Sequence, residues 1–121
     1  MLKNDQFTIT DLRREENIIK ANIGLNAAHP IFGGHFPGQP VLPGVCMMQM
    51  VKEVAGDHLN KKIKLVSATD LKFLVAVLPD QINSIQMELK INLEGENINV
   101  DAKLLDKEQV LFKFKGVFVN R

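Results

Sequence analysis

The segment from Asn26 to Gly44 constrains this chain more than any other feature. It contains four prolines and four glycines, a density that forbids a regular helix or strand. Apolar side chains that favour burial lie between them: Ile31, Phe32, Phe36, Val41 and Leu42. A buried loop stiffened by proline is expensive to order unless it shapes a site. The segment is therefore predicted to be a site-forming loop, not a linker.

Alternating and helical patterns flank this loop. Short strands are predicted around 7–12 and 18–25, with the polar residues 13–17 as the turn between them. A helix is predicted over 43–59, because Pro43 suits a first helical turn and apolar residues cover most of its surface. Four further strands are predicted, over 64–74, 84–93, 97–105 and 110–119. This order predicts an α+β fold with one helix packed on an antiparallel sheet, in a single domain 1–121.

Composition excludes several classes of function. With 15 basic and 14 acidic residues the net charge is +1, so no nucleic-acid partner is expected. The single cysteine, Cys46, rules out an internal disulfide and fits a reducing compartment. The N-terminus lacks the apolar stretch of a signal peptide, and no apolar run could span a bilayer. We expect a soluble, cytoplasmic protein with no membrane partner.

The loop places His35 just before the predicted start of the helix. A helix N-terminus offers unpaired backbone N–H groups and partial positive charge, here near Gly44 and Val45. A carbonyl oxygen bound there would be polarised, and a neutral imidazole could remove a proton from the adjacent carbon. Gly44 would let that oxygen approach the backbone closely. On the residues alone, a structural loop histidine remains the alternative for His35.

The run His35-Phe36-Pro37-Gly38-x-Pro40-x-x-Pro43-Gly44-Val45 resembles the signature of the 3-hydroxyacyl-acyl-carrier-protein dehydratases. The resemblance continues in Leu71-Lys72-Phe73 and Val77-Leu78-Pro79-Asp80. It implies a hot-dog fold, an antiparallel sheet wrapped around the helix 43–59. It also implies a dimer whose active sites lie at the interface, with the histidine from one chain and a carboxylate from the helix of the other.

The activity implied by the resemblance is that of a (3R)-hydroxyacyl-acyl-carrier-protein dehydratase, a lyase of fatty-acid or related acyl-chain biosynthesis. The acyl chain would be carried on the phosphopantetheine of acyl carrier protein or of CoA, and would lie in a tunnel at the interface. Elimination of water would give a trans-2-enoyl thioester without a metal or redox cofactor. Phe36 and Met48 are predicted to line the tunnel.

One position departs from the family pattern. Family members carry Glu or Asp where this chain has Gln49, and an amide has no labile proton to donate. General acid–base groups contribute about 10²–10⁴-fold, which corresponds to roughly 3–5 kcal/mol of barrier. We therefore expect impaired or partner-dependent catalysis. Glu53 shares the face of Gln49 and could reach back as a substitute, although a solvated charge on the helix face is the alternative.

Two other functions remain open at this point. The chain could be a weakly active, acyl-binding subunit whose His35 completes the site of a Glu-bearing paralogue. A hot-dog thioesterase is a third reading. The oligomer could be a homodimer, a heterodimer or a trimer of dimers, and the acyl length is not determined.

The remaining polar residues give weaker signals. Lys61, Lys62 and Lys64 could meet an acidic carrier protein or form a solvated turn. We interpret Cys46 as a small buried side chain in the core. Three scattered histidines and one cysteine give no metal-ligand spacing, so no metal site is expected.

Overall fold

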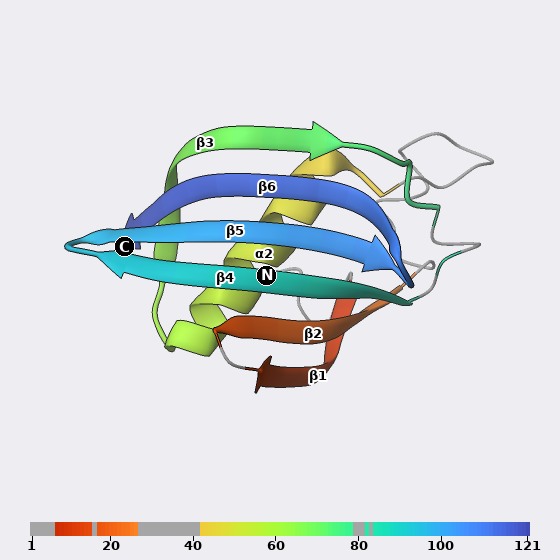
Figure 1. Cartoon of the computed structure of the whole chain (residues 1–121), viewed down its shortest axis with the longest axis horizontal. Helices are drawn as coiled ribbons and strands as arrows, with labels where there is room; N and C mark the ends of the chain where they lie inside the picture. The colour runs from red at the N-terminus through yellow and green to blue at the C-terminus, as the bar shows by residue number, and fades with distance from the viewer. Residues whose placement is uncertain (1–6, 16, 27–41, 79–81, 83) are drawn as a thin grey trace.

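The computed structural model describes residues 7–15, 17–26, 42–78, 82 and 84–121. In this part of the chain, six strands and one long helix are present (Figure 1). The elements are β1 (Phe7–Glu15), β2 (Ile18–Leu25), α2 (Gly44–Leu59), β3 (Ile63–Phe73), β4 (Ser84–Glu94), β5 (Asn97–Asp106) and β6 (Gln109–Asn120). The α+β prediction and all six predicted strands are confirmed, with small shifts at their ends.

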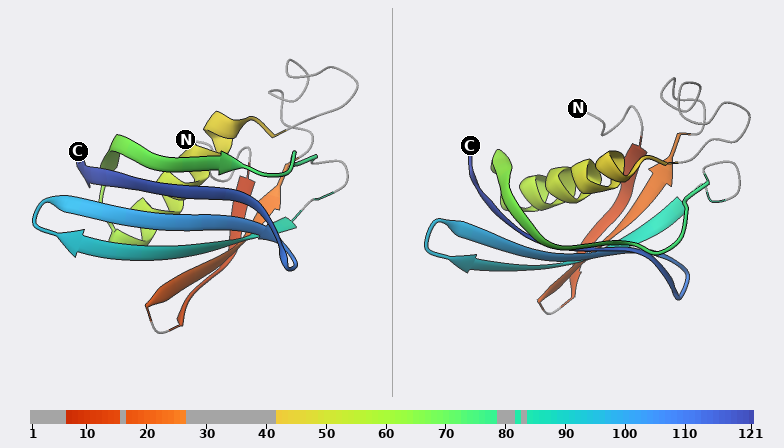
Figure 2. Two further views of the ribbon diagram at one scale, coloured as in Figure 1. Left: turned by 45° about the horizontal axis from the view of Figure 1, so that its top comes forward. Right: turned by 90° about the horizontal axis from the view of Figure 1, so that it is seen from above.

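The strands form one sheet in the order β1-β2-β4-β5-β6-β3, and every neighbouring pair is antiparallel. The sheet curves around α2, which lies along its concave face (Figure 2). β3 leaves the end of the helix and returns to the sheet beside β6, so it forms an edge. This arrangement is the hot-dog fold expected from the sequence.

Apolar side chains on the concave face of the sheet and on one face of α2 make the core. The alternation of β4 and β5 places one side of each strand against the helix, because successive side chains point to opposite faces. Along β6 a row of aromatic rings continues from Phe73 of β3: Phe73 and Phe112 stack with centroids 5.0 Å apart, and Phe112, Phe114 and Phe118 follow at 6.5 and 5.9 Å.

The helix is delimited by backbone geometry at both ends. Pro43 is its N-cap, with extended backbone angles, so α2 begins at Gly44 and not at Pro43 as predicted. At the other end, Asn60 adopts the left-handed conformation (φ 53°) and the Lys61 N–H donates to the Gly56 carbonyl at 3.0 Å. Such a left-handed residue terminates a helix by turning the chain away from its axis.

Two further sequence predictions need correction. Residues 13–15 belong to β1 and not to the turn. Glu15 forms an ion pair of 2.8 Å with Lys20 of β2, and the hydrogen bond from Lys20 lowers the pKa of the Glu15 carboxyl. Glu53 is 7% exposed and is the one buried charged residue in the described part of the chain. The reading of Glu53 as a solvated charge is therefore wrong.

Candidate functional site

The first turn of α2 presents backbone donors that have no acceptor among the described residues. The N–H groups of Cys46 and Met47 both reach the Pro43 carbonyl, at 3.0 and 3.3 Å. The N–H groups of Gly44 and Val45 precede the first possible intrahelical bond, and no hydrogen bond from either is found within the described residues. These two donors, with the partial positive charge of the helix N-terminus, can bind an oxygen that carries negative charge.

Phe73 packs directly against this turn. A Cβ built on Gly44 would lie 2.8 Å from two ring carbons of Phe73, closer than a real contact allows. A hydrogen bond of 2.8 Å from the Leu42 N–H to the Val77 carbonyl ties the same two segments together. Gly44 thus lets the ring approach the helix, and a shallow hollow forms where they meet. Its lining comprises Leu42, Pro43, Gly44, Met47 and residues 73–77.

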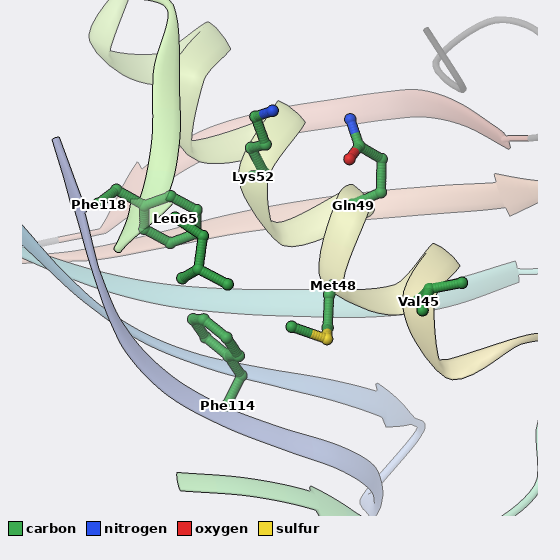
Figure 3. Close-up of a pocket in the computed structure, with 7 residues that line it drawn as sticks. All are labelled: Val45, Met48, Gln49, Lys52, Leu65, Phe114 and Phe118. Carbon is green, nitrogen blue, oxygen red and sulfur yellow. The ribbon is translucent and has the colours of Figure 1, made fainter. Parts of the chain in front are cut away.

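A second hollow of about 230 Å³ opens between the outward face of α2 and strands β3 and β6 (Figure 3). Its lining comprises Val45, Met48, Gln49, Lys52, Leu65, Phe114 and Phe118. We call it the acyl hollow, because five of these seven side chains are apolar. Phe114 and Phe118 belong to the aromatic row of β6, so the apolar floor continues the core outward.

The polar members of the acyl hollow both come from the helix. Gln49 and Lys52 are three residues apart, a spacing that places side chains on one helix face. In Figure 3 their polar ends point to the same side, away from Phe114 and Phe118. The hollow therefore has an apolar floor and a polar rim, which suits a ligand with an apolar chain and a polar group at one end.

A family model for ApeI-like proteins, described as ApeI dehydratase, matches residues 11–115. The match covers most of the chain, including the helix start and every residue of the acyl hollow except Phe118. This chain belongs to the ApeI-like dehydratase family. A dehydratase-like function goes with that membership, and the resemblance found in the sequence is confirmed.

Relatives of this ApeI-like chain include 3-hydroxyacyl-[acyl-carrier-protein] dehydratases named FabZ. The one from Caulobacter vibrioides is 28% identical over 123 residues, which span 92% of this chain and 68% of the relative. Another, from Geotalea uraniireducens, is 35% identical over 83 residues, 61% of this chain and 56% of the relative.

Solved structures share the fold. One chain of the dehydratase heterocomplex ApeI:P from Xenorhabdus doucetiae superposes with a TM-score of 0.74 at 20% identity, over 93% of this chain and 96% of that one. Cj0977, a sigma28-regulated virulence protein from Campylobacter jejuni, gives 0.69 at 13% identity, over 97% and 85%. At these identities the likeness establishes the hot-dog fold alone.

The residues predicted for the site are partly brought together. Val45, Met48 and Gln49 share the acyl hollow, whereas Gly44 lines the neighbouring hollow under Phe73. His35 and Phe36 lie outside the described residues, so their roles stay predictions. Glu53, the suggested substitute acid, is not among the residues that line the acyl hollow.

Sequence reasoning missed Lys52 and Phe73 as site residues. Lys52 had a usable signal, which is its spacing of three residues from Gln49 on the helix. Phe73 was quoted only as a point of family resemblance, and its contact with Gly44 depends on the β3–β6 pairing. That pairing is long-range and leaves no local signal in the sequence.

In the part of the chain that the structure describes, no helix has the length and apolar character needed to cross a bilayer. Those same residues include no group of three His, Cys, Asp or Glu side chains placed to hold a metal ion. The expectation that the site needs no metal stays a prediction, since His35 is not among them.

Proposed function

We propose that this chain eliminates water from 3-hydroxyacyl thioesters carried on the phosphopantetheine of acyl carrier protein. The observation that carries the proposal is the acyl hollow itself, with the Gln49 amide on its rim. One turn away are the N–H groups of Gly44 and Val45, which bond to none of the described residues. Relatives named for the same reaction support this choice of substrate.

The chemistry follows from these groups. The Gly44 and Val45 N–H groups polarise the thioester carbonyl, which acidifies the carbon next to it. His35 removes a proton from that carbon, the electron pair forms the C2–C3 double bond, and the C3–O bond breaks. Gln49 orients the departing hydroxyl but releases no proton. The hydroxyl therefore completes a water molecule with the proton that His35 has taken, which leaves a neutral imidazole for the next cycle.

This elimination changes no overall oxidation state, so the proposal includes no redox cofactor. It includes no metal because the Gly44 and Val45 N–H groups are assigned the polarisation of the carbonyl. The buried Cys46 thiol forms no disulfide within the described residues, which is compatible with a reducing compartment. We expect the protein to work in the cytoplasm. The acyl hollow gives no support to a thioesterase function, because none of its described lining residues has a carboxylate that could act on water.

The test is formation of enoyl thioester from 3-hydroxybutyryl-acyl-carrier-protein, followed by mass spectrometry. His35→Ala should lower kcat/KM by about 10²–10⁴-fold, in the wild type and in a Gln49→Glu background that gives a larger signal. His58→Ala is the matched control, because His58 lies at the opposite end of α2. Undiminished turnover in His35→Ala would contradict the proposal, and so would the absence of product from both wild type and Gln49→Glu.

We propose further that the working unit is a dimer paired along β3. This strand is a sheet edge, and it exposes several large apolar side chains: Leu65, Val66, Leu71 and Phe73. An exposed apolar edge invites pairing with another strand. Val45, on the outward face of α2, is 72% exposed and would be covered by the same partner. A second copy would therefore close the acyl hollow into a tunnel.

Sedimentation or light scattering tests the dimer, which should have twice the chain mass of 13.6 kDa. Val66→Lys should shift the equilibrium toward the monomer, because it places a charge on the paired edge. Leu93→Lys is the matched control: Leu93 is 56% exposed and Val66 59%, but Leu93 lies at the end of β4, away from β3. A monomeric wild type, or equal effects of the two variants, would refute the pairing.

The partner-subunit reading is the second candidate, favoured by Gln49 and by the solved ApeI:P heterocomplex. In a mixed dimer with a Glu-bearing dehydratase, His35 of this chain and the partner's acid would form one complete site. Co-expression with such a dehydratase tests it. If elimination by the mixed dimer survived His35→Ala in this chain, this reading would fail.

A further inference from the structure

Three lysines lie in a row across the convex face of the sheet. Lys113 of β6 is directly opposite Lys103 of β5 on one side and Lys72 of β3 on the other. Residues opposite one another in antiparallel strands have Cβ atoms roughly 4.5–5.5 Å apart, and like charges placed so are destabilising. We call Lys72, Lys103 and Lys113 the lysine row.

The neighbouring row shows what a balanced arrangement looks like. There Lys115 is opposite Asp101 and Asp70, and its ammonium lies 4.0 Å from the Asp101 carboxylate. In the lysine row only Lys103 has a carboxylate across from it, that of Glu88. Within the described residues none of its three ammonium groups forms an ion pair, and Lys113 has a lysine on both sides.

The lysine row also borders a hollow. Its lining comprises Asp70, Lys72, Asp101, Lys103, Lys113, Phe114 and Lys115, four ammonium groups against two carboxylates. All three lysines of the row are exposed, and the pairing proposed along β3 leaves side chains on the convex face accessible. The sheet thus holds a positive hollow that its own carboxylates do not neutralise.

We propose that this hollow is the docking surface for an acidic carrier protein, which delivers the acyl chain to the site. The inference rests on the proposed function for the nature of the cargo. Positive charge that the fold leaves unbalanced is complementary to an acidic partner and steers its approach. Binding would relieve the repulsion that Lys113 experiences in the free protein.

The position of the row supports this partner. Lys72 directly precedes Phe73, whose side chain points to the opposite face of β3 and packs against Gly44. A carrier docked on the lysine row therefore sits at the end of β3, next to the hollow shared by Phe73 and Gly44. Its flexible arm can pass that end of the strand and reach the N–H groups of the helix start.

The second basic cluster, Lys61, Lys62 and Lys64, is less well placed. It follows the C-terminal end of α2, a helix of 16 residues, and thus lies about 24 Å from Gly44 along the axis. A carrier docked there would have to deliver its cargo along the whole helix. Lys62 therefore provides a control with the same charge at the wrong end of the molecule.

The decisive variant is Lys113→Glu, which replaces two repulsive pairs by two attractive ones. Its midpoint of thermal unfolding should rise by about 2–5 °C, while KM for 3-hydroxybutyryl-acyl-carrier-protein should rise about five- to tenfold. KM for the N-acetylcysteamine thioester of the same acid, which has neither carrier nor phosphate, should stay within twofold. Lys62→Glu should leave all three quantities unchanged.

The outcomes separate this inference from the proposed function. If Lys113→Glu and Lys62→Glu affect KM for the carrier substrate equally, or not at all, the docking surface is wrong. An equal rise in KM with the CoA thioester would also overturn it, because the row would then bind phosphate and not the protein. If neither wild type nor Gln49→Glu turns over any thioester, the proposed function fails, and titration of the acylated carrier at low and high salt still decides the docking.

Discussion

The two faces of α2 differ in how completely the chain covers them. The face toward the sheet is closed: Met50, Val51, Val54 and Ala55 are fully buried. The outward face leaves Val45 exposed and Gln49 and Lys52 partly exposed, over the acyl hollow. Both faces carry apolar residues, so hydrophobicity alone does not distinguish them. One face therefore stabilises the fold, whereas the other is the face on which we propose that a ligand and a second subunit bind.

The aromatic row of β6 belongs to both regions. Phe112 is fully buried, and the solvent-exposed fractions of Phe114 and Phe118 are just as small. Yet Phe114 and Phe118 also border the acyl hollow. The side chains that form the floor of the hollow are therefore as deeply buried as those of the core. A preorganised apolar floor lowers the entropy lost when an acyl chain is bound.

The contrast between the two faces of α2 predicts its largest effect on the free energy of unfolding. Met50→Ala should lower the free energy of unfolding by about 2–5 kcal/mol, because Met50 is 0% exposed and its loss leaves a cavity. Val45→Ala, on the outward face of the same helix, should stay within about 0.5 kcal/mol when measured by urea unfolding at a concentration where the chain is monomeric. Similar losses at both positions would abolish the distinction between the faces.

Gly116→Ala tests the boundary between core and hollow. A Cβ at Gly116 would lie 2.5 Å from a Phe114 ring carbon and 2.8 Å from the Ser67 carbonyl oxygen, so both the ring and the β3 backbone must shift. We expect a loss of about 1–3 kcal/mol in stability. Gly24→Ala is the control, because its nearest neighbour would be the Thr8 carbonyl oxygen at 3.8 Å. If the two alanine variants proved equally stable, the tight packing of Phe114 would be refuted.

A smaller and more selective effect is expected at Met48, which lines the acyl hollow without being fully buried. Met48→Phe should change stability by less than about 1.5 kcal/mol. The larger ring takes space from the hollow, so kcat/KM should fall about tenfold for a long 3-hydroxyacyl chain, a loss typical of about 1–3 kcal/mol of pocket contacts. The value for the 3-hydroxybutyryl substrate should hardly change. A loss that is independent of chain length would argue against this hollow as the acyl site.

Much of this account could be predicted from local patterns. Alternation located the strands, Pro43 and the apolar periodicity located α2, and the motif around Gly44 placed Gln49 beside the helix start. Each of these signals lies within a few residues of what it predicts.

The features that the sequence did not reveal depend on long-range pairing. The contact of Phe73 with Gly44 and the lysine row both require knowledge of which strands are neighbours. The burial of Glu53 depends on tertiary packing around α2, which its position in the helix does not reveal. The register that brings Lys72 and Lys113 together crosses two bulges in the β3–β6 pair, and a shift of one residue would have sent these side chains to the other face.

The most direct test of the central claim compares wild type with Gln49→Glu in the dehydration of a 3-hydroxyacyl-acyl-carrier-protein. The claim is that the outward face of α2 holds a dehydratase site complete except for its acid. It predicts that Gln49→Glu forms enoyl thioester at least about 10²-fold faster than wild type, with little change in KM. A wild type that already turns over as fast as Gln49→Glu would contradict the claim, because the amide would then suffice.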